Sequence, residues 1–385
     1  MVCGGGIMWK VIENVSVVLE NRIIWDGVIL INGETIADVG AKGTVLVPED
    51  AQRIDGCGAY VGPGLVDIHV HGGNGYNTWE EPEKAGEYFL RHGTTTFLAA
   101  MSGSRTFDVI MDGIARLKGA MGKVKNLKGI FFEGPYFNTL YGANAHKNPW
   151  KGPIEKEQYT AMVDLAGDAA VSWMIAPERP GVHEFMSYAR KVNPQLIFTV
   201  GHSEATPEQI HKLGNMRPKI LTHAMNATGR VNEVRGIRGS GPDEYCYTNP
   251  DMYAELISDS CAIHVTPMNQ QFLLKIKGLE RVILVTDGTA YNNPAPEKYA
   301  HIDDLNFDDK GGLAGSRLTM DKACRNVMSS TGCGIAQAFL MASTNPARAM
   351  GWDDIGSIEM GKRANLVFVD DKFNVKQVML DGEIC

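Results

Sequence analysis

Six residues that could bind a divalent metal ion, or exchange protons with a water beside it, each stand at the end of a short apolar run. They are His69, His71, Glu133, His202, His223 and Asp287. Imidazole and carboxylate groups are the usual nitrogen and oxygen ligands of catalytic zinc. A parallel barrel directs the carboxyl ends of its strands to one mouth, so residues far apart in the chain can meet there. The pattern therefore predicts one metal-dependent active site.

The first two histidines lie in the segment GLVDIHVHG, two positions apart. On a strand this spacing places both imidazoles on one face, where they can bind the same ion. Such a pair is by itself a weak signal, because it is at least as often a surface or loop feature. Gly72 and Gly73 follow directly and favour an open loop, in which an ion could be reached.

Glu133 follows three apolar residues and precedes a Gly-Pro pair, which predicts that its carboxylate stands at the end of a strand. A carboxylate can bridge two cations through separate oxygens, so Glu133 could join the first histidine pair to His202 and His223. The alternative for Glu133 is an exposed acid in a turn. Either of the later histidines alone would more often be structural than a metal ligand.

Asp287 ends the run VILVTDG. A carboxylate at the mouth of a barrel, beside a metal site, is well placed to accept and return protons. The alternative interpretation is a helix N-cap.

The elements that would position these residues alternate between apolar runs and amphipathic segments, the pattern of repeated βα units. Eight runs are predicted as strands: 61–71, 94–101, 129–134, 171–177, 196–202, 219–224, 261–265 and 281–287. Eight such units close a barrel. The fold class predicted is α/β: a (β/α)8 TIM-like metal-dependent hydrolase barrel over residues 61–354, with a small β-sandwich formed by residues 1–60 and 355–385. Residues 238–252 and 289–312 are expected to be long surface loops.

Composition narrows the classes of protein that remain. The chain has 385 residues, of which 44% are hydrophobic, so one barrel and a small satellite can bury a sizeable core. Its net charge of -8 argues against nucleic-acid binding, and no apolar run reaches membrane-spanning length. Seven cysteines without a CxxC pair are expected to be reduced thiols. We expect a cytoplasmic protein with a small-molecule substrate.

The same stretches resemble the amidohydrolase superfamily, and within it the N-acetylglucosamine-6-phosphate deacetylase family, from about Trp9 to the end of the chain. The HxH motif belongs to the whole superfamily, whereas the EGP, THxxNA and LAGSxLTM motifs are much more specific. The segments that carry the resemblance are GPGLVDIHVHG, FFEGPYFN, GANAHKNP, GHSEAT, LTHAMNATGR, LVTDG, GGLAGSRLTM, STNPARAMG and GKRANLVFVD.

The resemblance implies roles for particular residues. Glu133, His202 and His223 would hold the metal common to the family, His69 and His71 would permit a second ion, and Asp287 would be the acid-base group. The implied substrate contacts are Ala145 and His146 for the sugar, Asn226 and Ala227, Arg230 and His264 near the phosphate, and Leu313, Ala314 and Gly315 at the acetyl end. Because the family takes its phosphate arginine from a neighbouring subunit, the resemblance also implies a homodimer.

The implied reaction is metal-dependent hydrolysis of the acetamide of N-acetylglucosamine 6-phosphate. Zinc is the expected metal, as one or two ions, with iron and manganese as alternatives because the ligand set suits all three. Another amidohydrolase, acting on the galactosamine epimer, an N-acyl amino acid or a cyclic amide, is a second interpretation. A non-catalytic scaffold is a third, although none of the expected ligands is missing.

Overall fold

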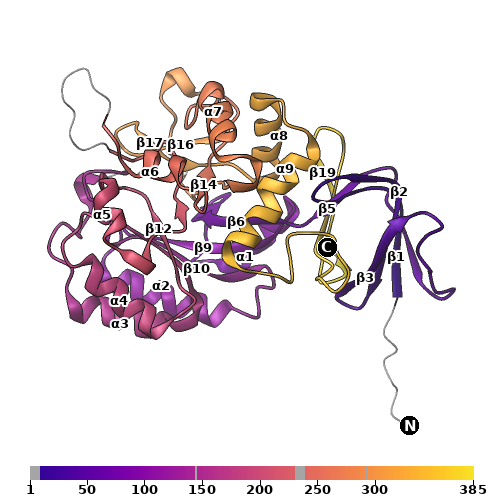
Figure 1. Ribbon diagram of the computed structural model, residues 1–385, viewed down its shortest axis with the longest axis horizontal. Helices are drawn as coiled ribbons and strands as arrows, with labels where there is room; N and C mark the ends of the chain where they lie inside the picture. The colour runs from indigo at the N-terminus through magenta and orange to yellow at the C-terminus, as the bar shows by residue number, and fades with distance from the viewer. Residues whose placement is uncertain (1–8, 144, 230–238, 292) are drawn as a thin grey trace, which may run out of the picture.

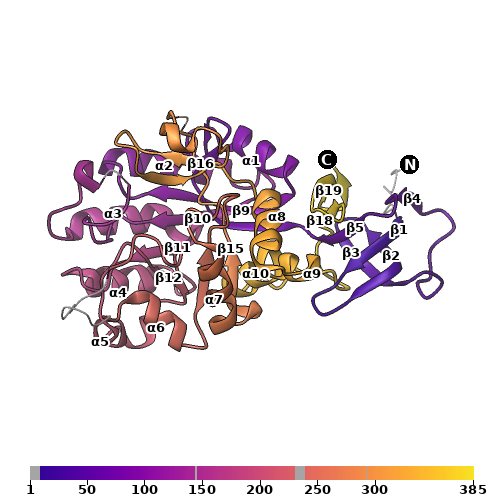
Figure 2. The ribbon, with the colours of Figure 1, turned by 90° about the horizontal axis from the view of Figure 1, so that it is seen from above.

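The chain forms a large α/β body with a small β domain at one end (Figures 1 and 2). The computed structural model describes residues 9–143, 145–229, 239–291 and 293–385. The metal-binding candidates all lie in the large body, and the small domain combines segments from both ends of the chain.

The large body is built around eight parallel strands that form a closed barrel. In chain order they are β6 (Leu65–Val70), β9 (Thr94–Ser102), β10 (Leu127–Glu133), β11 (Ala170–Ile175), β12 (Ile197–Val200), β13 (Ile220–Leu221), β14 (Tyr253–Leu256) and β15 (Val282–Leu284), and each strand pairs with the next. The barrel closes where the residues after β15 meet β6: the backbone N–H of Asp287 donates to the carbonyl of His69 (3.0 Å), and that of His71 to Gly288 (2.8 Å). The predicted α/β class and the (β/α)8 barrel are therefore confirmed.

Seven of the eight predicted strands overlap observed strands of the barrel. The exception is the prediction for residues 261–265, which is wrong. Residues 261–265 form a turn, and the barrel strand is β14, which begins eight residues earlier. In the sequence, residues 261–265 resemble a buried strand more than residues 253–256 do, because β14 contains the charged residue Glu255. In the structure, however, Glu255 is buried, with 1% of its surface exposed. A buried acid with specific partners broke the apolar pattern on which the prediction depended.

The two segments expected to be long loops also contain regular structure. Residues 242–248 form helix α6 (Pro242–Thr248), which begins at a proline. Within 289–312, strand β16 (Leu305–Phe307) pairs antiparallel with β17 (Leu313–Ser316). This hairpin lies close to the barrel mouth, because Ser316 forms a bridge with Gly288.

Helices cover the outside of the barrel (Figure 1). They are α1 (Pro82–Arg91), α2 (Phe107–Ala120), α3 (Lys156–Ala166), α4 (Val182–Val192), α5 (Pro207–His211), α6, α7 (Pro267–Lys277), α8 (Met320–Thr331), α9 (Ile335–Phe339) and α10 (Asn345–Met350). Their apolar faces pack on the outward side chains of the strands, which leaves both faces of the sheet buried. Among the residues that the structure describes, no helix is long and apolar enough to cross a membrane.

Inward side chains fill the barrel in layers. The lower layers are apolar and include Val66, Phe131 and Ile283. Above them, at the carboxyl ends of the strands, the inward positions become polar, and His69 is fully buried there. The barrel is therefore a packed core that supports a polar site at one end only.

The small domain is a single hydrogen-bonded sheet in the order β20-β19-β18-β5-β1-β2-β3, with β4 paired to β1. Its strands are β1 (Trp9–Val18), β2 (Ile23–Asn32), β3 (Thr35–Ala41), β4 (Gln52–Asp55), β5 (Tyr60–Pro63), β18 (Leu366–Val369), β19 (Val375–Leu380) and β20 (Glu383–Ile384). The two ends of the chain meet where β5 pairs antiparallel with β18. Two apolar clusters pack against this sheet, and the larger includes Ile12, Ile29, Phe368 and Met379.

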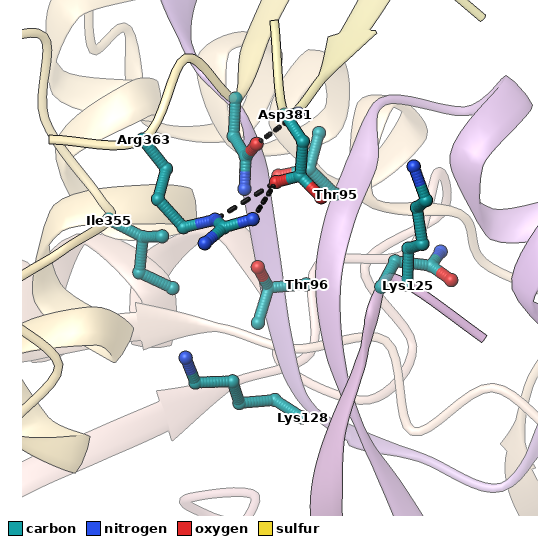
Figure 3. Close-up of a pocket in the computed structure, with 9 residues that line it drawn as sticks. Thr95, Thr96, Lys125, Lys128, Ile355, Arg363 and Asp381 are labelled. Atoms are coloured by element: carbon teal, nitrogen blue, oxygen red, sulfur yellow. Dashed lines mark hydrogen bonds and ion pairs between the residues drawn. The ribbon is translucent and has the colours of Figure 1, made fainter. Parts of the chain in front are cut away.

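A polar pocket of about 100 Å³ lies between the small domain and the amino-terminal ends of β9 and β10, at the end of the barrel opposite the metal-binding candidates (Figure 3). The barrel contributes Thr96, Lys125 and Lys128 to its lining. From the other side, Arg363 donates to Asp381 (2.9 Å) and also reaches Glu34 (3.1 Å). Arg363 thus connects turns of the small domain where it meets the barrel.

We predict that Arg363→Ala lowers the free energy of unfolding by about 1 to 3 kcal/mol, because Asp381 is only 11% exposed and would lose its charged partner. Urea unfolding monitored by circular dichroism measures this change. The matched control is Arg53→Ala, which removes an exposed arginine paired with Glu13 and should cost less than about 1 kcal/mol. Equal effects in the two variants would contradict a stabilising role for Arg363 at the seam.

Candidate metal centre and active site

The structure brings the six candidate residues together at the carboxyl end of the barrel. Glu133 is the last residue of β10, while His69 lies near the end of β6. His202, His223 and Asp287 follow β12, β13 and β15 by two or three residues. Each side chain is thus placed by a strand end, as expected for a site built on a parallel barrel.

Glu133 is the centre of the first ligand group. Its Oε1 atom lies 3.0 Å from His202 Nε2 and 3.2 Å from His223 Nε2, and these two nitrogens are 3.0 Å apart. Ligand atoms about 2.0 to 2.1 Å from one tetrahedral ion would be separated by about 3.3 Å. The three atoms therefore have nearly the spacing of one face of a metal coordination sphere.

The second ligand group shares the same carboxylate. Glu133 Oε2 lies 3.1 Å from His71 Nε2, and Glu133 Oε1 lies 3.7 Å from His69 Nε2. In each group, one atom from every residue lies within 4.8 Å of the others. Glu133 can therefore bridge two ions through its two oxygens, or serve one ion in either group.

Asp287 stands beside the second group. Its Oδ1 atom lies 3.4 Å from His71 Nε2 and 3.5 Å from His69 Nε2. The main chain of Asp287 is held on both sides, because its N–H donates to His69 and its carbonyl accepts from Ser316 N (2.8 Å). The carboxylate is thereby fixed close to the ligand atoms.

Backbone strain marks three of the six positions. The φ angles of His202, His223 and Asp287 are 45°, 31° and 46°. Residues other than glycine seldom adopt the left-handed region, at a cost of order 1 to 3 kcal/mol each. The strained backbone turns sharply at the strand ends, and the rest of the barrel must stabilise it.

The electrostatics of the site favour a bound cation. Burial alone would raise the pKa of Glu133, but the imidazoles of His202, His223 and His71 hold it well below its usual value. For His71, burial opposes protonation, yet hydrogen bonds to Asp287 and Glu133 raise its pKa to about 10. The two carboxylates thus create a strongly negative field, which protons on the histidines, or a metal in their place, can neutralise.

The donor set also fits a metal. His69 Nε2 is buried and has no hydrogen-bond partner among the described residues, although it points toward Glu133 and Asp287. An unsatisfied buried nitrogen is costly unless something else binds its lone pair. Histidine nitrogen with carboxylate oxygen suits zinc, iron or manganese.

The residues expected to contact substrate lie in loops around this mouth. Gly315 touches the site directly: a Cβ atom there would lie 2.5 Å from the carbonyl oxygen of Asp287. Asn226 and Ala227 follow His223 closely, with Asn226 N donating to the carbonyl of His223 (3.0 Å). Leu313 and Ala314 precede Gly315 in β17.

The other expected contacts that the structure describes lie in the segments after β10 and β14. Ala145 and His146 lie in the short 3₁₀ helix η1 (Ala145–Lys147), where His146 is exposed. His264 is held by Asp259, whose carboxylate lies 3.1 Å from His264 Nδ1. Arg230 lies outside the described residues.

Sequence reasoning missed three acidic residues that support the site. Glu255 accepts hydrogen bonds from His69 Nδ1 and from His223 N, both at 3.0 Å. Asp67 accepts from Thr286 Oγ1 (2.6 Å), and burial raises the pKa of Asp67 to about 7. Asp67 also accepts from the backbone N–H of His69 (3.2 Å), and its place in the same apolar run, two residues before His69, was the available signal.

The third missed residue, Glu178, fixes the loop that carries His202. Its carboxylate accepts from Ser203 Oγ (2.7 Å), the backbone of Glu204 (2.8 Å) and Asn138 Nδ2 (3.0 Å). Glu178 thus joins the loop after β12 to the loop after β10. Glu178 lies in the segment that connects β11 to α4, and nothing in the local sequence indicates that it supports the loop of His202.

The barrel and its shared-carboxylate site are those of a metal-dependent hydrolase, and the chain belongs to the Amidohydrolase family, whose model matches residues 60–385. It is 28% identical to the N-acetylgalactosamine-6-phosphate deacetylase of Escherichia coli O157:H7, over 84% of this chain and 86% of the relative. It is 27% identical to the N-acetylglucosamine-6-phosphate deacetylase of Vibrio furnissii, over 84% and 82% of the two chains.

Solved structures agree with this placement. The N-acetylglucosamine-6-phosphate deacetylase of Thermotoga maritima superposes with a TM-score of 0.80 at 25% identity, covering 97% of this chain and 99% of the other. The enzyme of that name from Pasteurella multocida gives a TM-score of 0.85 at 24% identity, covering 98% and 100%, and shows the shared fold.

We predict that Gly315→Ala reduces turnover of an acetylated amino-sugar phosphate at least about tenfold without removing the metal, because the new methyl group displaces Asp287. Gly315 has a φ of 64° and no space for a Cβ atom. The control is Gly311→Ala, whose φ is also positive (77°) but whose nearest neighbour would be an ordinary contact at 3.4 Å. Acetate release and metal content measure both variants, and equal turnover in the two would contradict the prediction.

Proposed function

We propose that this protein hydrolyses the acetamide of N-acetylglucosamine 6-phosphate to glucosamine 6-phosphate and acetate, in amino-sugar catabolism. The observation that carries the proposal is the position of Glu133 between two pairs of histidines, with Asp287 beside one pair. Membership of the Amidohydrolase family and the names of the relatives support the same reaction.

The proposed metal ligands are Glu133, His202 and His223, with His69 and His71 for a second ion, and zinc is the proposed metal. A divalent cation held there would supply Lewis-acid chemistry, polarising the amide carbonyl and lowering the pKa of water toward about 7. The protein's part is to hold the five ligand side chains in place and to keep the carboxylate of Glu133 in its charged form. The low pKa of Glu133 serves this purpose.

Asp287 is the proposed acid-base residue. Its carboxylate would accept the proton of the attacking water and then deliver it to the amide nitrogen as the bond to carbon breaks. The surrounding imidazoles favour its charged form, since the charge of His69 and a hydrogen bond from His71 lower the pKa of Asp287 against the opposing effect of burial. The residue is thus ready to accept a proton at neutral pH.

Substrate contacts would come from the loops at the barrel mouth. We assign Ala145, His146, Asn226, Ala227 and His264 to the sugar and its phosphate, together with Arg230. Leu313, Ala314 and Gly315 would line the acetyl end, which suits the contact of Gly315 with Asp287. We also propose a homodimer, in which an arginine of the second copy would bind the phosphate of the substrate.

The proposal also includes the organisation of the chain and its location. Residues 61–354 would form the catalytic barrel, and residues 1–60 and 355–385 the small β domain. A cytoplasmic location suits an enzyme whose substrate is a phosphorylated sugar.

A second candidate function is deacetylation of N-acetylgalactosamine 6-phosphate. The observation that favours it is the 28% identity to the N-acetylgalactosamine-6-phosphate deacetylase of Escherichia coli O157:H7. The identity to the N-acetylglucosamine-6-phosphate deacetylase of Vibrio furnissii is 27%, which is nearly the same. The two sugars differ only in the configuration of one hydroxyl group. Substrate contacts, rather than the metal ligands, would therefore distinguish the two functions.

The test is acetate release from N-acetylglucosamine 6-phosphate, its galactosamine epimer and unphosphorylated N-acetylglucosamine, with zinc-loaded and metal-free protein. We expect the glucosamine phosphate to have the highest kcat/KM and the unphosphorylated sugar the lowest. Chelator-treated protein should be inactive until zinc, iron or manganese is restored. A higher kcat/KM for the galactosamine epimer would favour the second candidate function over the first. Hydrolysis by metal-free protein would rule out the metal mechanism.

We predict that Asp287→Asn retains its metal but loses about 10²- to 10⁴-fold in kcat, because the amide cannot accept the proton. Elemental analysis and acetate release on the same preparation measure both effects. The control is Asp303→Asn, an acid whose side chain is 84% exposed and pairs with Lys322, which should leave kcat unchanged. Undiminished turnover in Asp287→Asn would refute the proton-transfer role.

A further inference from the structure

Glu255 occupies an unusual position for a carboxylate. It lies within β14, one strand away from β15 and two from β6, and only 1% of its surface is exposed. Its strand neighbours Tyr253 and Ile257 belong to the apolar cluster inside the barrel, so the period-two alternation also points Glu255 inward. A charge in such a place is costly unless its oxygens are well bonded.

One oxygen of Glu255 joins two of the metal-ligand strands. Its Oε2 atom accepts from the ring Nδ1–H of His69 and from the backbone N–H of His223, both at 3.0 Å. The main-chain carbonyl of Glu255 also accepts from Ala224 N (2.9 Å). Glu255 therefore fixes the residues at the end of β13 and the imidazole at the end of β6 relative to each other.

The bond to His69 decides which ring nitrogen can bind a metal. A carboxylate accepts and cannot donate, so the proton of neutral His69 must lie on Nδ1. The lone pair then lies on Nε2, the atom that faces Glu133 and Asp287 and that no other described residue bonds. The Nδ1 atoms of His202 and His223, by contrast, have no hydrogen-bond partner among the described residues.

We propose that Glu255 is a positioning residue for the metal centre. It holds His69 in the tautomer and orientation that present Nε2 to an ion, and it anchors the strand end that carries His223. Carboxylates that orient metal-bound histidines in this way typically change metal affinity 10- to 100-fold when they are removed. The inference rests on the proposed metal-dependent function, but its test does not require turnover.

The experiment measures Zn²⁺ affinity of metal-free protein by competition with a chromophoric chelator, and the bound zinc by elemental analysis. The variants are Glu255→Gln, which keeps the size and one acceptor oxygen but removes the charge, and Glu255→Ala. The matched control is Asp321→Asn, a buried carboxylate that lies 3.3 Å from Nδ1 of His92, a histidine outside the ligand set. Thermal unfolding of each metal-free protein measures any purely structural effect.

We expect both Glu255 variants to bind zinc about 10- to 100-fold less tightly, with Glu255→Ala the more affected. Asp321→Asn should bind zinc as the unaltered protein does. If Glu255→Ala fails to fold, Glu255→Gln still decides the question. Unchanged zinc affinity and stoichiometry in Glu255→Gln, with only a lower unfolding temperature, would overturn the proposal and leave Glu255 a structural residue. Failure of the proposed function would appear separately, as absent acetate release by the unaltered, zinc-loaded protein.

Discussion

The carboxylate of Glu133 is the constraint on which the rest of the site depends. Four histidines from three separate strand ends converge on its two oxygens, at distances between 3.0 and 3.7 Å. A buried anion is stable only when positive groups or donors surround it, and imidazoles meet that requirement whether they carry protons or bind a metal. The same arrangement that stabilises Glu133 therefore defines where a cation would lie.

The arrangement requires strained backbone conformations at the strand ends. His202, His223 and Asp287 all have positive φ angles, so each strand ends in an abrupt turn. Hydrogen bonds to the main chain stabilise these turns. Ser316 N donates to the carbonyl of Asp287, and His223 N donates to the carboxylate of Glu255. Gly315 brings the β16–β17 hairpin against Asp287 at a distance that no larger residue allows. Rigid support of this kind is what a preorganised catalytic site requires.

The two ends of the barrel serve different purposes. The carboxyl end carries the strained, charged residues, whereas the amino end meets the small β domain across a polar seam. At that seam, Arg363 and Asp381 form a bond within the small domain, and no described metal-binding group lies there. Changes at the seam should therefore alter stability, while changes at the mouth should alter chemistry.

The sequence by itself determined the barrel, the six residues at its mouth and the kind of chemistry they suggest, because each residue ends an apolar run and local patterns reveal strand ends. Only the tertiary structure decided the seventh strand and the supporting contacts. Glu255 interrupts the apolar pattern of β14, and its partner His69 lies 186 positions away. Likewise, the approach of Gly315 to Asp287 depends on how a hairpin folds over the barrel. Such contacts arise from closure of the whole barrel, and no local pattern of residues encodes them.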